Sequence, residues 1–290
     1  MNTFKYKKVS TIDDALLALS TDNSKLIAGG TDLLLKVKHG MSRINILVDI
    51  SQIEKFSYVK DESGSIHIGA GTKIDDIIRS EILVSKAPII PLVALEVASP
   101  EIRNAATVGG NVCCAKANCG TCFLPGCKAM TGDRTVKPCQ NASYSDLLLP
   151  FAAYDAVAVI RSSGGTRKVQ MENFIKPDGK IDISNKEILT EIFFKQEASK
   201  KAYMCLRYPK SMGLPYFSVI ADFKGGEKFD LTIGGATKSI YKFRGVSRED
   251  VTVSLVDKFV FKESIYLSKE YLKTVAPSLI LEAMDKALEV

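Results

Sequence analysis

The sequence lacks several features that would indicate a membrane protein or a secreted one. No apolar run reaches the roughly 18 residues that a membrane helix needs, because the longest candidates, residues 87–98 and 151–160, are interrupted by proline, glutamate or aspartate. The first ten residues, MNTFKYKKVS, contain no apolar signal core. We therefore expect a cytoplasmic protein without membrane insertion.

Histidine is scarce, with only His39 and His67 in 290 residues. There is no recognisable Ser-His-Asp set, no pair of catalytic carboxylates, and no molybdopterin or [2Fe–2S] motif. The net charge of +6 is modest, and lysine and arginine are spread along the chain. This distribution favours a solvated surface and predicts no nucleic-acid binding.

Cysteine, in contrast, is concentrated in one stretch. Six of the seven cysteines lie between Cys113 and Cys139. In a reducing cytoplasm, clustered thiols are more often metal ligands than disulfides. Zinc sites commonly combine cysteine with histidine, and both histidines are distant in sequence. The pattern therefore favours an iron–sulfur cluster over an all-cysteine zinc site, with disulfides or a redox switch as a third alternative.

Two Gly-Gly elements are candidates for binding an anionic ligand. The first, Gly29-Gly30, lies between a short β-prone run and the start of an apolar helix. Glycines allow close backbone approach, and free amides at a helix start favour negative charge, so a pyrophosphate would suit this turn. The second is Gly109-Gly110, followed by Asn111. Either element alone could be a simple chain reversal, but together they suggest two walls of one extended site.

The remaining pattern predicts a mixed structure. Helices are expected at residues 10–20, 73–78, 90–98, 147–155 and 269–288, a buried strand at 44–50, and hairpins at 56–70 and 156–171. A Ser-Pro stop at residues 99–100 should end the helix before it. The last third reads as strands followed by a helix, after a polar stretch at residues 175–185 where we place a domain boundary.

The ordered segments LIAGGTDLLL, IGAGT, SPEIRNAATVGGN and SDLLLPFAAYDA resemble the FAD-binding medium subunit of the molybdenum hydroxylases, the xanthine dehydrogenase and carbon monoxide dehydrogenase family. The resemblance covers essentially the whole chain. It implies an α+β fold with a two-part FAD-binding domain of the vanillyl-alcohol-oxidase (PCMH) type at residues 1–176. A smaller α+β domain of the carbon monoxide dehydrogenase flavoprotein type would follow at residues 177–290.

The same resemblance implies which residues would contact FAD. In the family pattern, the first glycine loop would hold the pyrophosphate, the second would form another FAD loop, and an aspartate would contact the ribityl chain or flavin. Ile188 and Leu189 would match a position that packs near the flavin, and a basic residue, Arg207 or Lys210, would follow in a later strand. The cofactor-binding residues are thus Leu26, Ile27, Ala28, Gly29, Gly30, Thr31, Asp32, Thr107, Gly109, Gly110, Asn111, Asp146, Leu189 and Lys210.

Residues 112–145 make this chain longer than most of the family between the second glycine loop and the Ser-Asp-Leu motif. Such an insertion resembles the 4-hydroxybenzoyl-CoA reductase β-subunit branch, in which the added loop binds a [4Fe–4S] cluster. The expected ligands are Cys119, Cys122, Cys127 and Cys139. Cys113 or Cys114 could replace the first of these, or could pack beside FAD. Cys205 is expected to be a buried core residue.

The resemblance implies an electron-transferring subunit of a multi-subunit enzyme, possessing FAD and a [4Fe–4S] cluster. Its expected partners are a molybdopterin-binding large subunit, a small subunit with two [2Fe–2S] clusters, and an external carrier such as ferredoxin or NAD, in a heterotrimer. Two other hypotheses are a zinc-clipped, non-catalytic docking subunit and a stand-alone flavin oxidoreductase. The retained glycine loops argue against the first, and the missing acid/base pair argues against the second.

Overall fold

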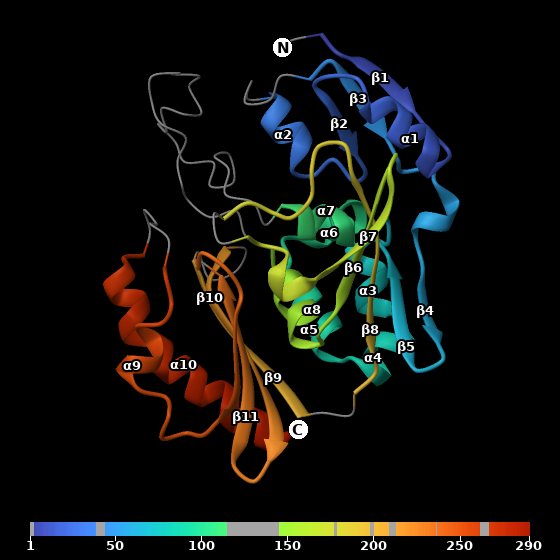
Figure 1. Ribbon diagram of the computed structural model, residues 1–290. Coiled ribbons are helices and arrows are strands. Elements are labelled where there is room, and N and C mark those ends of the chain that lie inside the picture. The colour runs from blue at the N-terminus through green and yellow to red at the C-terminus, as the bar shows by residue number, and fades with distance from the viewer. Residues whose placement is uncertain are drawn as a thin grey trace.

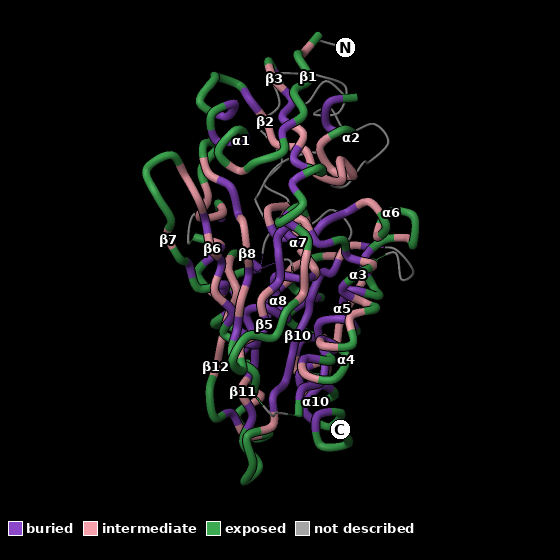
Figure 2. Tube along the Cα trace, turned by 90° about the vertical axis from the view of Figure 1, so that its right-hand side faces the viewer, coloured by how far each residue is buried: buried purple, intermediate pink, exposed green. Residues whose placement is uncertain are grey.

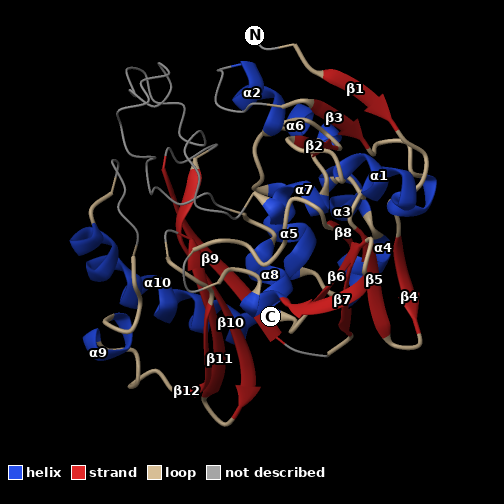
Figure 3. Cartoon of the chain, turned by 45° about the horizontal axis from the view of Figure 1, so that its top comes forward, coloured by secondary structure: helices blue, strands red, loops and turns tan. Residues whose placement is uncertain are grey.

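The computed structural model describes residues 3–38, 44–114, 145–176, 179–197, 200–208, 213–235, 237–261 and 267–290. These residues form a mixed α/β structure with three separate sheets (Figure 3). Across these ranges, no helix is both long enough and apolar enough to span a bilayer.

The N-terminal part is a small parallel sheet with strand order β1–β3–β2. Its strands are β1 (Lys5–Lys8), β2 (Ser24–Ile27) and β3 (Ile46–Asp49). Helix α1 (Ile12–Leu19) packs on β2 and β3. It begins at Thr11, whose side chain accepts a hydrogen bond from the amide of Asp14, and acidic residues in its first turn favour the positive end of the helix. The helix predicted for residues 10–20 is therefore confirmed.

A five-stranded antiparallel sheet forms the middle of the molecule, with strand order β4–β5–β8–β6–β7. Its strands are β4 (Val59–Glu62), β5 (Ser65–Gly69), β6 (Val157–Ser162), β7 (Gly165–Gln170) and β8 (Ile188–Lys195). Both predicted hairpins are present. The β4–β5 turn has positive φ at Ser63 (53°) and Gly64 (79°), as the tight primed hairpin turn requires. Strand β8 pairs with β5 and β6, so the sheet extends past residue 176, and the boundary expected there stays a prediction.

Short helices cover one face of this sheet and lie between it and the C-terminal part. They are α3 (Ile74–Arg79), α4 (Glu81–Lys86), α5 (Ile89–Leu95), α6 (Pro100–Ala105), α7 (Val108–Cys113) and α8 (Leu148–Ala153), with 3-10 turns η1 (Glu54–Phe56) and η2 (Met171–Asn173). Helix α2 (Leu33–Lys38) packs instead against the small N-terminal sheet (Figure 1). The helix predicted for residues 90–98 ends at Leu95. Pro100 then begins α6, because the first helical position tolerates a residue without an N–H group.

The C-terminal part is a four-stranded antiparallel sheet with order β12–β11–β10–β9. It contains β9 (Lys200–Tyr208), β10 (Leu214–Gly225), β11 (Lys228–Gly235) and β12 (Tyr241–Val246), followed by α9 (Val253–Val256) and α10 (Lys269–Glu289). Helix α10 packs against β9 and β10, while α5 and α8 contact the same sheet from the side of the first part (Figure 1). Strand β10 is consequently buried along most of its length (Figure 2).

Candidate functional site

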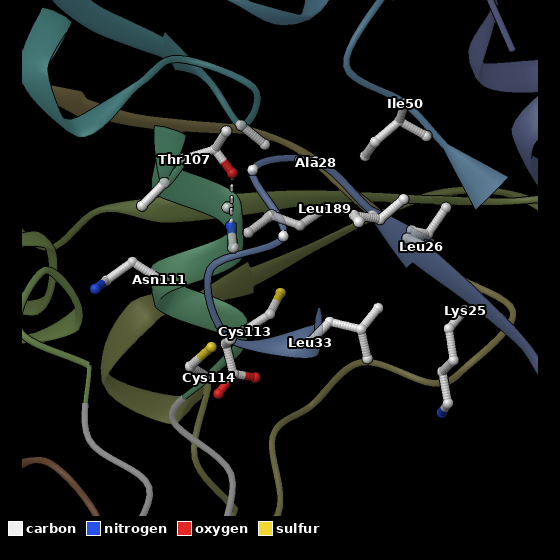
Figure 4. A pocket seen from close by; sticks show the side chains of 18 of the residues that line it. Lys25, Leu26, Ala28, Leu33, Ile50, Thr107, Asn111, Cys113, Cys114 and Leu189 are labelled. Atoms are coloured by element: carbon white, nitrogen blue, oxygen red, sulfur yellow. Dashed lines mark hydrogen bonds between the residues drawn. The ribbon is translucent and has the colours of Figure 1, made fainter. Parts of the chain in front are cut away.

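A cavity of about 440 Å³ opens where the small N-terminal sheet meets the middle of the molecule. Three stretches that are distant in sequence form most of its lining: residues 24–35, residues 97–114 and residues 181–189. Its volume is within the range of ordinary cofactor pockets. Figure 4 shows its lining side chains.

The first wall is the Gly29-Gly30 turn between β2 and α2, and its geometry requires glycine. A Cβ atom on Gly29 would lie 1.9 Å from the carbonyl oxygen of Ala105, and Gly30 has a φ of +70°. Among the residues that the structure describes, none accepts a hydrogen bond from the amides of Gly29, Gly30 or Thr31. These amides belong to residues that line the cavity. Such an arrangement is suited to an anionic group that needs donors.

Asp32 also lines the cavity, but its charge is already paired. Lys36, one helical turn further on, donates to the Asp32 carboxylate at 2.7 Å, and the lysine side chain is only 11% exposed. The paired lysine offsets the repulsion that a bare carboxylate would exert on a nearby anion. The acidic residue in this turn therefore does not exclude a phosphate from the wall.

The second wall is the N-terminal turn of α7, where the sequence suggested either a loop or a tight turn. Thr107 caps this helix, because its hydroxyl oxygen accepts a hydrogen bond from the amide of Gly110 at 3.2 Å. Gly109 packs on Ala70, where an added Cβ atom would lie 2.8 Å from the Ala70 Cβ. Gly110, by contrast, is exposed and faces the cavity. The two glycines thus differ: one is required by packing, and the other lines open space.

Arg103 shapes the part of this wall that precedes α7. Its Nη1 donates to the carbonyl oxygens of Val97 and Ala98, both at 3.0 Å. Ala98 has a φ of +44°, a conformation that is uncommon for a residue with a side chain. The two hydrogen bonds stabilise this strained turn, and both carbonyl-bearing residues line the cavity.

Cys113 and Cys114, at the end of α7, line the cavity as well (Figure 4). Burial raises the pKa of the Cys114 thiol to about 12, and the nearby Asp32 carboxylate adds to the rise. The Cys114 thiol is therefore protonated at neutral pH and is not a reactive thiolate. The sequence left two roles open for this pair, as a cluster ligand or as residues that pack beside FAD. The structure places both cysteines at the wall of the cavity.

The third wall, residues 181–189, was not predicted apart from Ile188 and Leu189. Arg167 on β7 fixes it from behind: its guanidinium contacts the Glu187 carboxylate through Nε (2.7 Å) and Nη2 (3.0 Å), and donates to the carbonyl oxygen of Asp182 at 2.7 Å. The hydrogen bonds from Arg167 lower the pKa of Glu187 to about 2. A bidentate pair of this kind holds a segment in one orientation. The sequence contained only a polar stretch here, which gave no signal for a binding wall.

Asp146 and Arg207 form a separate, buried ion pair and are not part of the described cavity lining. Arg207 also contacts Glu96 at 2.8 Å and donates to the Gly213 carbonyl oxygen at 3.1 Å. Burial raises the pKa of Asp146, an effect that the Arg207 charge opposes. The expected flavin contact of Asp146 stays a prediction. In this structure its carboxylate joins the first part of the chain to β9.

The structure brings twelve of the predicted cofactor residues together around one cavity. They are Leu26, Ile27, Ala28, Gly29, Gly30, Thr31, Asp32, Thr107, Gly109, Gly110, Asn111 and Leu189. Lys210 and the predicted cluster ligands Cys119, Cys122, Cys127 and Cys139 lie outside the described residues. Within the described ranges, no group of three or more histidine, cysteine, aspartate or glutamate side chains is arranged to hold a metal ion.

Comparison with known proteins identifies the family. A family model described as the FAD binding domain in molybdopterin dehydrogenase matches residues 2–194, more than half of the chain. The xanthine dehydrogenase FAD-binding subunit of Escherichia coli O157:H7 is 30% identical over 191 residues, which cover 65% of this chain and 56% of that subunit. The nicotinate dehydrogenase FAD-subunit of Eubacterium barkeri is 26% identical over 220 residues, covering 74% of this chain and 66% of the relative.

This chain belongs to the family of FAD-binding domains of molybdopterin dehydrogenases. Its fold is also that of a chain in the carbon monoxide dehydrogenase structure from Hydrogenophaga pseudoflava, with a TM-score of 0.82 and 19% identity over 99% of this chain and 98% of the other. The chain spans less than two thirds of the length of the E. coli relative, 56%.

Proposed function

We propose that this chain is the FAD-binding, electron-transferring subunit of a multi-subunit molybdenum hydroxylase or reductase. It would pass electrons between the [2Fe–2S] clusters of a partner, its own FAD and an external carrier such as ferredoxin or NAD. An additional [4Fe–4S] cluster in residues 112–145 would make it a member of the 4-hydroxybenzoyl-CoA reductase β-subunit branch. The molybdopterin-binding large subunit would perform the substrate chemistry, because this chain has no recognisable acid/base set of its own.

The observation that carries the flavin assignment is the fit of the first glycine turn to a pyrophosphate. Gly29 leaves no room for a side chain, and the amides of Gly29, Gly30 and Thr31 have no acceptor among the described residues. The neighbouring Asp32 is paired with Lys36. A diphosphate would supply the missing acceptors at this point. Leu26, Thr107, Asn111 and Leu189 would then hold the two halves of the cofactor on either side.

Bound FAD supplies the exchange between two-electron and one-electron carriers, whereas the protein binds and orients it. The apolar residues of the cavity, among them Ile50, Ile183 and Leu189, would exclude water from the cofactor. Gly109 packs against Ala70, the residue after β5, and its amide donates to the Ala70 carbonyl oxygen at 2.8 Å, which holds α7 against the end of that strand. These residues would keep the flavin in a fixed position relative to the partner subunits.

Residues 115–144, which contain the four predicted cluster ligands, are called the cysteine-bearing segment. The residues on either side of it support a role for this segment in electron transfer to or from FAD. At its start, Cys114 lines the cavity, and at its end, Ser145 donates a hydrogen bond to the side chain of Asn111, which also lines the cavity. The two described residues that flank positions 115–144 therefore lie at the cavity wall (Cys114) and hydrogen-bonded to it (Ser145). A cluster held by Cys119, Cys122, Cys127 and Cys139 would be connected directly to the flavin site.

The proposal is tested by isolating the chain and identifying any flavin it releases on denaturation. We expect FAD, retained after gel filtration, in a protein that does not oxidise any substrate of this enzyme class by itself. Addition of the large and small partner subunits should then restore turnover. A folded chain that binds no flavin, or one that turns over substrate alone, would contradict the proposal.

A further inference from the structure

We call the third wall of the cavity, residues 181–189, the strap; it leads into β8 and is held at its base by hydrogen bonds. Asp182 donates from its amide to the carbonyl oxygen of Phe174 at 2.8 Å, and Arg167 fixes Glu187 and Asp182. Within the strap, the amide of Ser184 donates to the Glu187 carboxylate at 2.7 Å. Residues 184–187 therefore form a compact turn, and Asn185 lies near its tip.

One contact joins this tip to the opposite wall. The Lys25 Nζ donates to the Asn185 Oδ1 at 3.0 Å, across 160 positions of sequence. Lys25 is on β2, immediately before the glycine turn, and both residues line the cavity. The hydrogen bond therefore connects the third wall to β2 at the rim of the cavity, where Asn185 is exposed.

Figure 4 shows Lys25 and Asn111 at opposite ends of the lining, with Ala28, which leads into the glycine turn, between them. The Lys25 end combines apolar Leu26 and Ile50 with polar groups from Lys25 and Asn185. A flat heteroaromatic base with a hydrogen-bonding edge suits such a lining. At the other end, Asn111 accepts a hydrogen bond from Ser145, the first described residue after positions 115–144.

We propose that Lys25 and Asn185 form a latch that encloses the adenosine half of FAD and makes the site select the dinucleotide over FMN. The proposal rests on the proposed flavin function, with the pyrophosphate at Gly29 and Gly30. The isoalloxazine ring is assigned to the Asn111 end because, in the proposed function, electrons would pass to the cluster ligands that follow Cys114 in the sequence. FMN has no adenosine half and would not reach the latch.

The test uses the full chain and compares dissociation rates of FAD and FMN for four variants. Lys25→Met keeps the apolar stem and removes the donor, Asn185→Ala removes the acceptor, and Asn185→Asp retains an acceptor for Lys25. Lys186→Met is the matched control, because it removes an exposed lysine beside the tip whose side chain is not part of the cavity lining. Each variant is first checked for unchanged thermal unfolding.

Lys25→Met and Asn185→Ala should each release FAD about 3- to 10-fold faster, as expected for loss of one solvent-exposed hydrogen bond. Release of FMN should not change, the double variant should be no faster than either single one, and Asn185→Asp should resemble the wild type. Equal effects on FAD and FMN, additive effects, or an effect of Lys186→Met of the same size would overturn the latch. A wild-type chain that binds neither flavin would overturn the proposed function itself.

Discussion

The carboxamide oxygen of Asn111 accepts two hydrogen bonds, from the hydroxyl of Ser145 at 2.9 Å and from the amide of Leu147 at 3.2 Å. Ser145 in turn accepts from the amide of Leu148 at 3.1 Å. A residue of the cavity wall therefore organises the start of α8, on the other side of the cysteine-bearing segment. These hydrogen bonds join the second wall of the cavity to the start of α8.

Asn111→Ala should lower the free energy of unfolding by about 1–3 kcal/mol, because the buried amide of Leu147 loses its acceptor. Flavin affinity should fall with it, since the same residue lines the cavity. Urea unfolding and flavin titration measure the two effects. Asn104→Ala is the control: Asn104 is exposed and donates only within its own helix. If both variants behave alike, Asn111 has no special role.

Gly110 provides a cleaner test of the glycine walls than Gly29 or Gly30. A Cβ atom at Gly110 would meet only the Thr107 hydroxyl, at 3.0 Å, whereas at Gly29 it would meet a backbone carbonyl at 1.9 Å. Gly110→Val should therefore fold and lose most of its flavin affinity, while Gly29→Ala should lose about 3 kcal/mol of stability. Gly164→Ala, in an exposed turn with ordinary contacts, should change neither quantity. Normal flavin content in Gly110→Val would remove this loop from the site.

The strap should make stability depend on acidic pH through Glu187. Its pKa in the folded protein, about 2, is below its ordinary value of 4.5 because of the hydrogen bonds from Arg167. The resulting stabilisation is present above about pH 4.5 and is lost as the pH falls towards 2. Glu187→Gln should thus be destabilised relative to the wild type at pH 6 and much less so near pH 2.5.

Urea unfolding at a series of pH values measures this difference. Glu54→Gln, a change at an exposed residue of η1, is the control and should follow the wild-type curve. A constant difference between Glu187→Gln and the wild type across the acidic range would show that the carboxylate charge does not stabilise the strap.

Cys139→Ser should remove iron from the protein while FAD remains, because the predicted ligands and the described cavity are separate groups of residues. Iron and flavin are quantified on the same anaerobic sample. Cys205→Ser is the matched control: Cys205 is on β9, where its sulfur accepts a hydrogen bond from Ser218 at 3.2 Å, and it should retain both cofactors. Unchanged iron in Cys139→Ser would move the ligand set to other cysteines.

The local elements of the fold could be predicted from the sequence where a single feature determined them. The turn between β4 and β5 follows from Gly64, which tolerates positive φ, and α1 follows from its cap and its apolar spacing. The glycine turn before α2 was identified in the same way. Each of these features depends on neighbours within a few residues.

The third wall and the ion pair of Asp146 could not be predicted because they depend on distant partners. Lys25 and Asn185 are separated by 160 positions, and Asp146 and Arg207 by 61. A polar loop contains no periodicity that reveals which wall it contacts. The pairing of β8 with β5 was missed for the same reason, since the register is set by the packed sheet.

The most direct test of the account is the cofactor content of the anaerobically purified chain, with flavin, iron and zinc quantified and ultraviolet–visible and low-temperature EPR spectra recorded. We predict one FAD and about four irons per chain, with a reduced [4Fe–4S] signal. Flavin without iron, or zinc in its place, would contradict the electron path through the cysteine-bearing segment, and a chain without flavin would contradict the account as a whole.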